Sequence, residues 1–122
     1  MKKILLVDDD QDLLDAISDL LEVFNFSVIQ AIDGTEALNI YRQSLISEEP
    51  IDIIILDLNI PGGMGGKKSI DEFLKINPNV LTIVTSGYNS DPVMMNPKQH
   101  GFTSSIIKPY DIEELVDLIN SL

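Results

Sequence analysis

Short runs of apolar residues alternate along this chain with longer segments in which apolar residues recur every three or four positions. The short runs are rich in Ile, Leu and Val and cover residues 4–7, 28–32, 51–56, 80–84 and 106–107. Runs of this length and composition predict five β-strands. Where the apolar residues are consecutive, as at 53–56, the strand is expected to be buried on both faces.

The longer segments predict helices. Residues 13–21, 37–45, 70–76 and 112–119 place their apolar side chains at helical spacing. Residues 90–100 predict a weaker helix, because Pro92 suits a first turn whereas Pro97 removes a hydrogen bond from the interior. Asp10 or Asp12 is the expected N-cap of the first helix.

Strand and helix thus alternate five times, which predicts an α/β fold. Parallel neighbouring strands need crossover connections, so we expect a doubly wound (βα)5 arrangement with helices on both faces of a five-stranded sheet. The expected strand order is the flavodoxin-like 2-1-3-4-5. The 122 residues contain no linker or low-complexity tract, so we expect one domain, 1–122.

Composition excludes several classes of function. Eight basic and twenty acidic residues give a net charge of −12, which disfavours binding to nucleic acid by this domain. The chain has no cysteine and therefore neither disulfides nor thiolate metal ligands. No run is long enough to span a bilayer, and the first apolar run is shorter than that of a signal peptide. We expect a cytoplasmic protein without a membrane partner.

Polar side chains follow the predicted strands. Asp8 and Asp9 follow the first strand, Asp57 the third, Thr85 the fourth and Lys108 the fifth. Ligands of open parallel sheets bind at the carboxyl ends of the strands. We therefore expect several carboxylates, a hydroxyl and an ammonium group to converge at one edge of the sheet.

This set of groups indicates a particular chemistry. Crowded carboxylates repel each other and are usually relieved by protonation or by a cation. Oxygen-only ligands favour Mg²⁺, with Mn²⁺ as the alternative, over zinc. A metal ion and the ammonium group of Lys108 could neutralise phosphoryl oxygens while the carboxylate of Asp57 attacks in line. The product would be an aspartyl phosphate.

Four motifs carry a family resemblance: LLVDDD, IIILDLNIP, IVTSGY and IIKPY, in this order. With them the chain resembles a response-regulator receiver domain of two-component signalling over essentially its full length. The resemblance implies that Asp57 is the phosphoacceptor. It also implies that Asp9, Asp57 and the backbone carbonyl of Asn59 ligate Mg²⁺, and that Asp8 acts mainly through a metal-bound water.

The same resemblance assigns further roles. Lys108 would pair with the acceptor carboxylate or the phosphoryl group, the hydroxyl of Thr85 would move to the phosphoryl oxygen, and the bond between Lys108 and Pro109 would be cis. The phosphodonor would be a phosphohistidine on a histidine kinase or a histidine phosphotransfer protein. The domain would be no turnover enzyme but a switch for protein contacts that assists its own phosphorylation and dephosphorylation.

Two departures from the family pattern affect the expected switch. The loop after Pro61 holds four glycines, and we expect it to be one residue longer than is usual in receivers. Ser105 stands where many receivers have an inward-turning aromatic residue, so coupling is expected to come from residues 62–66 and 91–100 instead. The cluster VTSGY, GF and KPY is also similar to receivers fused to hybrid sensor kinases.

Two other classes of protein compete with this interpretation. The Asp-x-Asp of Asp8 and Asp10 is shared with haloacid dehalogenase-type phosphatases, but these have a Thr or Val where Asp12 stands. A receiver that serves only for docking would typically have lost its acidic residues.

Overall fold

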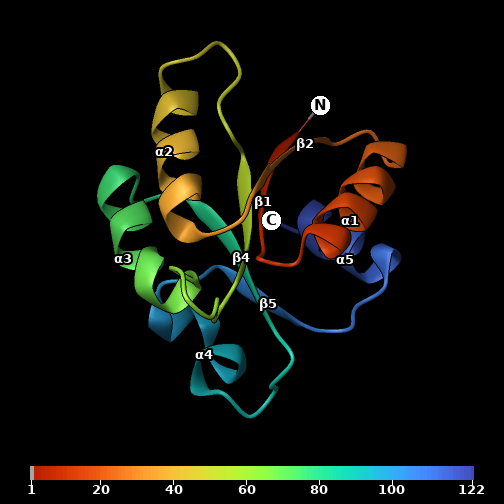
Figure 1. The fold of residues 1–122 in the computed structure, drawn as a ribbon, viewed down its shortest axis with the longest axis vertical. Helices are drawn as coiled ribbons and strands as arrows, with labels where there is room; N and C mark the ends of the chain where they lie inside the picture. Colours follow the sequence, from red (N-terminus) through yellow and green to blue (C-terminus); the bar gives the residue numbers. More distant parts are fainter. Residues whose placement is uncertain (1) are drawn as a thin grey trace.

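The computed structural model describes residues 2–122, so Met1 of the predicted domain lies outside the described residues. Five parallel strands form one sheet in the order β2-β1-β3-β4-β5 (Figure 1). The strands are β1 (Lys3–Val7), β2 (Ser27–Ala31), β3 (Ile53–Asp57), β4 (Leu81–Ser86) and β5 (Ser104–Ile107). The predicted fold class and strand order are confirmed.

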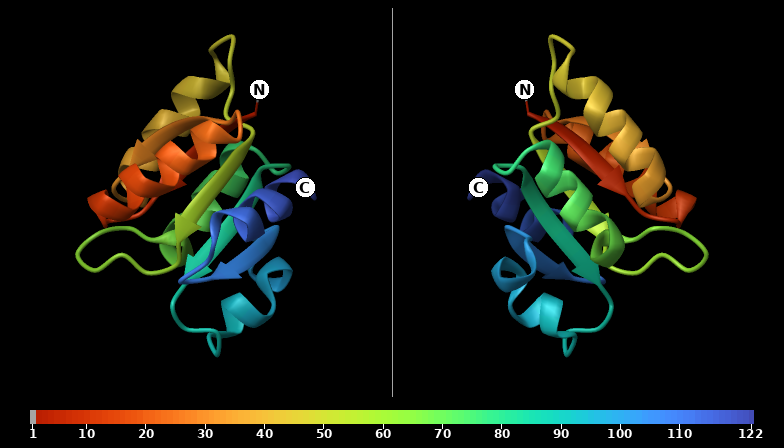
Figure 2. Two further views of the ribbon diagram at one scale, coloured as in Figure 1. Left: turned by 90° about the vertical axis from the view of Figure 1, so that its right-hand side faces the viewer. Right: turned by 90° about the vertical axis from the view of Figure 1, so that its left-hand side faces the viewer.

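Helices cover both faces of this sheet, as a doubly wound fold requires (Figures 1 and 2). They are α1 (Gln11–Val23), α2 (Gly34–Leu45), α3 (Gly66–Ile76), α4 (Pro92–Met95) and α5 (Ile112–Asn120). Helices α1 and α5 lie on one face, and α2 and α3 lie on the other (Figure 1). Among residues 2–122, the structure has no helix that is both long and apolar enough to span a bilayer.

The alternation of side chains along β3 explains its unbroken apolar run. Ile53 and Ile55 belong to the core cluster that packs under α1 and α5, while Ile54 and Leu56 belong to the cluster under α2 and α3. All four side chains are at most 1% exposed. A strand with a core on each face needs an apolar residue at every position.

The predicted weak helix of residues 90–100 is split in two. Helix α4 ends at Met95, and a 3₁₀ helix, η1, covers Pro97–His100. Pro97 has no N–H to continue the α-helical pattern, which is the physical reason for the break. The backbone carbonyl of Met94, in α4, instead accepts a hydrogen bond from the hydroxyl of Ser105 on β5, at 2.9 Å.

Asp10 is the N-cap of α1, and its carboxylate accepts a hydrogen bond from the N–H of Leu13. Of the two residues predicted for this role, Asp10 therefore performs it. The cap places the first turn of α1 directly after Asp8 and Asp9, at the carboxyl end of β1.

Candidate functional site

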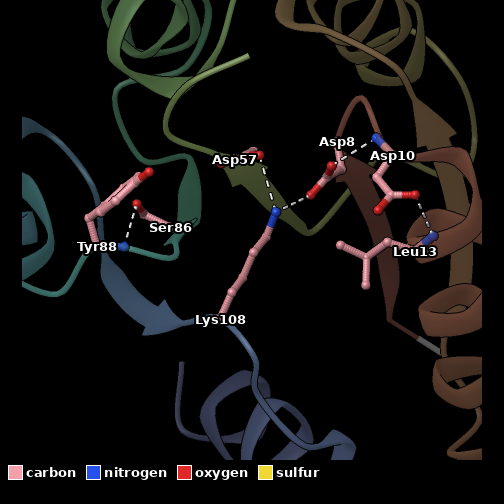
Figure 3. A network of polar contacts seen from close by, with 7 residues as sticks. All are labelled: Asp8, Asp10, Leu13, Asp57, Ser86, Tyr88 and Lys108. Carbon is pink, nitrogen blue, oxygen red and sulfur yellow. Dashed lines mark hydrogen bonds and ion pairs between the residues drawn. The ribbon is translucent and has the colours of Figure 1, made fainter. Parts of the chain in front are cut away.

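Lys108 joins two strand ends at the carboxyl edge of the sheet (Figure 3). Its Nζ donates hydrogen bonds to Oδ2 of Asp8 at 2.6 Å and to Oδ2 of Asp57 at 3.1 Å. Asp57 is the last residue of β3, Asp8 follows β1 and Lys108 follows β5. Residues 100 and 51 positions apart in the chain are thus in direct contact.

Three carboxylates gather at this edge of the sheet. Asp8, Asp9 and Asp57 each offer one oxygen, and these oxygens lie within 4.8 Å of one another. Asp8 is buried, Asp57 is partly buried and Asp9 is exposed. An all-oxygen set with one side open to solvent matches the ligand preference of Mg²⁺, which usually retains several waters. The cluster therefore fits the predicted metal.

Asn59, the fourth predicted ligand, lies two residues beyond β3. Its backbone lies close enough to the carboxylate of Asp57 to act against the rise in the pKa of that group. The next peptide group along the chain therefore lies close to the acidic cluster. This contact helps to fix the start of the loop between β3 and α3.

The charges of the site are strongly coupled. Burial is the main cause that raises the pKa of Asp57, and repulsion by Asp8 adds to it, while Lys108 acts in the opposite direction. For Lys108, burial alone lowers the pKa, but the combined attraction of Asp8 and Asp57 outweighs it and the net shift is upward. Lys108 therefore remains an ammonium group, and the cluster still carries excess negative charge that a cation could neutralise.

Thr85 lies beside the acceptor on the neighbouring strand. It pairs with Asp57 in the register of β3 and β4, and its backbone carbonyl accepts a hydrogen bond from the N–H of Leu58 at 2.9 Å. The residue is 2% exposed. The hydroxyl of the next residue, Ser86, accepts a hydrogen bond from the N–H of Tyr88 (Figure 3). The carbonyl of Ser86 accepts one from the N–H of Lys108.

Tyr110 is a neighbour of the site to which the sequence assigned no role. Burial raises its pKa to about 12. With Leu13, Ile17, Lys108 and Pro109 it lines a cavity of about 340 Å³. In the sequence analysis, Tyr110 appeared only as the last residue of the motif KPY. The bond between Lys108 and Pro109 is cis, as predicted.

A five-stranded flavodoxin-like sheet with three acidic groups and a lysine at its carboxyl edge defines the class of receiver domains. The family model for the response regulator receiver domain matches residues 4–120. The chain belongs to this family.

Individual relatives agree with this assignment. Sporulation initiation phosphotransferase F of Bacillus subtilis is 28% identical over 118 residues, covering 97% of this chain and 90% of the relative. The C4-dicarboxylate transport transcriptional regulatory protein DctD of Rhizobium meliloti is 31% identical, over 93% of this chain, and the chain spans 23% of that protein's length. A receiver domain protein from Clostridium thermocellum superposes with a TM-score of 0.88 at 29% identity, covering 99% of this chain and 93% of that one.

Proposed function

We propose that this chain is the phosphoacceptor receiver of a two-component or phosphorelay system, and that Asp57 accepts a phosphoryl group from a phosphohistidine. The contact that carries the proposal is the bridge of Lys108 between Asp8 and Asp57, beside the cluster of three carboxylates. An ammonium group and an acidic cluster that could hold a metal ion, both at the carboxylate that ends β3, suit in-line phosphoryl transfer.

The transfer forms one bond and breaks another. A carboxylate oxygen of Asp57 attacks phosphorus, and the P–N bond of the donor phosphoimidazole breaks as its electron pair returns to the imidazole nitrogen. The product is an acyl phosphate on Asp57 and a histidine whose ring nitrogen can take up a proton.

Asp8, Asp9, Asp57 and the carbonyl of Asn59 would hold Mg²⁺, or Mn²⁺ as the alternative. When bound, the metal neutralises charge on the phosphoryl oxygens. Receiver domains generally bind Mg²⁺, and the acidic cluster of this chain has the oxygen ligands that such a site needs.

Two further side chains act on the phosphoryl group. Lys108 lies within 3.1 Å of the acceptor oxygen and can follow it as charge develops on the phosphate. Thr85 holds a hydroxyl on the adjacent strand, at the position from which it could donate to a phosphoryl oxygen. Both residues favour phosphoryl transfer to Asp57 and the later hydrolysis of the aspartyl phosphate. The domain is thus a switch that assists its own chemistry, not an enzyme that turns over a substrate.

The partners follow from this role. A histidine kinase or a histidine phosphotransfer protein supplies the phosphoryl group, and a surface that includes α5 and the neighbouring face passes the signal to an output partner or a fused domain. The net charge of −12 argues against direct contact with nucleic acid. A two-component receiver of this kind works in the cytoplasm.

Intact mass after incubation with Mg²⁺ and acetyl phosphate or phosphoramidate tests the proposal. The wild type should gain one phosphoryl group, and Asp57→Asn should gain none. Asp117→Asn, which removes an exposed carboxylate on α5, is the matched control and should behave as the wild type. Modification of Asp57→Asn at the wild-type rate would refute the assignment, and rapid turnover of a small phosphoester would favour a phosphatase.

A further inference from the structure

The loop between β3 and α3, residues 58–65, folds back onto its own beginning. It leaves the carboxyl end of β3 and projects from the sheet before α3 starts (Figure 2). Asn59, at its start, has its backbone close to the carboxylate of Asp57 and offers the proposed metal-ligating carbonyl. Gly65, at its end, is the N-cap of α3 and returns to the same place.

Gly65 has no space for a side chain. A Cβ atom there would lie 2.6 Å from the carbonyl oxygen of Leu58, 2.9 Å from the nitrogen of Ile60 and 3.0 Å from Cα of Asn59. All three are backbone atoms, which cannot turn away as a flexible side chain can. The N–H of Lys67 also donates to the carbonyl of Leu58, at 3.1 Å. The first turn of α3 is therefore packed directly behind the peptide groups of Asn59.

A second contact holds the outer part of the loop. The N–H of Gly34, in the first turn of α2, donates to the carbonyl of Met64 at 2.5 Å. A Cβ on Gly34 would lie 2.7 Å from that carbonyl oxygen and 3.0 Å from Cβ of Ser69. The side chain of Met64 packs against the core cluster under α2 and α3. The loop is thus held between two helices by backbone contacts that only glycine permits.

We propose that Gly65, assisted by Gly34 at the outer contact, is a positioning residue for the metal site: its lack of a side chain sets the place of the Asn59 peptide beside the acidic cluster. The proposal rests on the proposed function, because it assigns Asn59 as a ligand. Neither glycine touches Asp8, Asp9 or the carboxylate of Asp57 in any contact described above. Their effect on the metal passes through the backbone of residues 58–60.

A metal ligand is sensitive to displacements of a few tenths of an ångström. An added methyl group at 2.6–3.0 Å from three backbone atoms must move the segment by at least that much. Changes in groups that orient metal ligands typically weaken metal affinity 10- to 100-fold. We expect Gly65→Ala to lie at the lower end, on the order of 10-fold, since the three carboxylates stay in place.

Titration with Mn²⁺, followed by electron paramagnetic resonance of the free ion, measures this affinity without any phosphodonor. Gly65→Ala should bind Mn²⁺ roughly 10-fold more weakly than the wild type. Gly87→Ala is the matched control, because a Cβ on Gly87 meets no atom within 4 Å; its affinity should equal that of the wild type. The amide resonance of Asn59 should shift in Gly65→Ala and stay in place in Gly87→Ala, a local effect that a general loss of stability does not produce.

The outcomes separate this inference from the proposed function. If the wild type and Asp9→Asn bind Mn²⁺ equally weakly, the metal site itself is wrong and the inference falls with it. If Asp9→Asn loses affinity while folded Gly65→Ala binds as tightly as the wild type, only the inference is overturned. If Gly65→Ala does not fold, Gly34→Ala takes its place, and an unchanged Mn²⁺ affinity in that variant counts against the proposal.

Discussion

The two loops that border the proposed phosphorylation site differ in how they are held. In the loop between β3 and α3, Gly65 packs against the backbone of Leu58 to Ile60, and Gly34 of α2 bonds to Met64. In the loop between β4 and α4, residues 87–91, Gly87 has no neighbour within 4 Å for a Cβ, and Tyr88 is 74% exposed. We call the first the fixed loop, because backbone contacts hold it on two helices. We call the second the free loop: Tyr88 bonds to Ser86 and Asp91 pairs with Lys67 of α3, but Gly87 and Tyr88 are exposed.

This difference suggests a division of labour along one edge of the sheet. The fixed loop carries the proposed ligand Asn59, and a metal site benefits from ligands held in place before the metal arrives. The free loop follows Thr85, the residue expected to move on phosphorylation. Segments with few packed contacts open at low free-energy cost. A shift of the free loop would therefore disturb little of the core.

Mg²⁺ should produce the largest effect, and it should act on the fixed loop. Binding relieves the repulsion among Asp8, Asp9 and Asp57, which only the folded chain brings together. At a hundredfold excess over the dissociation constant, the free energy of unfolding should rise by about 2.7 kcal/mol. Asp9→Asn should lose most of this gain in thermal melts. Hydrogen exchange should slow in residues 58–65 more than in residues 87–91, and equal slowing in both would contradict the comparison.

The second largest effect should come from adding a methyl group to one glycine in each loop, because the two loops should respond differently. Gly65→Ala should lower the free energy of unfolding by about 1–3 kcal/mol, because overpacking against backbone atoms forces the segment to shift. Gly87→Ala should stay within about 0.5 kcal/mol of the wild type, since the new methyl group points into open space. Urea denaturation measures both. Equal losses in the two variants would show that the loops are held alike.

The hydroxyl of Ser105 should matter for α4 and not for the fixed loop. Ser105→Ala removes the donor to the carbonyl of Met94 and should cost about 1 kcal/mol. Exchange should quicken in residues 92–100 and stay unchanged in residues 58–65. Ser104→Ala, one position earlier on β5, is the control. The same measurement with beryllofluoride, a phosphoryl mimic, should show changes at α4 without any aromatic residue at position 105.

The smallest effect is the pH dependence contributed by Asp57. Its folded-state pKa is raised, mainly by burial, from 3.8 in its ordinary environment. Between 3.8 and the raised pKa, the carboxyl group of Asp57 keeps its proton in the folded chain and loses it in the unfolded chain. The contribution of Asp57 to stability is therefore full below pH 3.8 and is lost as the pH rises through the raised pKa. Asp57→Asn should remove this slope from urea titrations made without metal. A slope that is unchanged in Asp57→Asn must come from another group.

Much of the fold followed from local patterns. The apolar run before Asp57 predicted a strand buried on both faces, and Ile53 to Leu56 divide between two core clusters as that requires. Pro97 predicted the weak point in residues 90–100, where the structure has a break between α4 and η1. The bounds of β4 and β5 extend beyond the apolar runs, because Thr85, Ser86, Ser104 and Ser105 join the ladder through their backbones.

For the site, the sequence alone indicated which residues meet but not how they meet. Position at the carboxyl end of a parallel strand is a topological property, and it was enough to bring Asp8, Asp57 and Lys108 together. The sequence assigned residues 62–66, which include four glycines, a part in the coupling of the switch. The structure adds a packing role that the sequence did not indicate, because Gly65 allows close contact with the backbone of residues 58–60.

Hydrophobic periodicity therefore determined the order of the elements and the faces that form the core. Position after a predicted strand determined which side chains meet at the site. Only the tertiary structure decided that Lys108 lies closer to Asp8 than to Asp57, that Ser105 bonds to Met94, and that Gly65 backs Asn59. The physical reason is range. Hydrophobic periodicity acts over a few neighbouring residues, whereas hydrogen bonds and close contacts depend on ångström-scale distances between segments that are far apart in the chain.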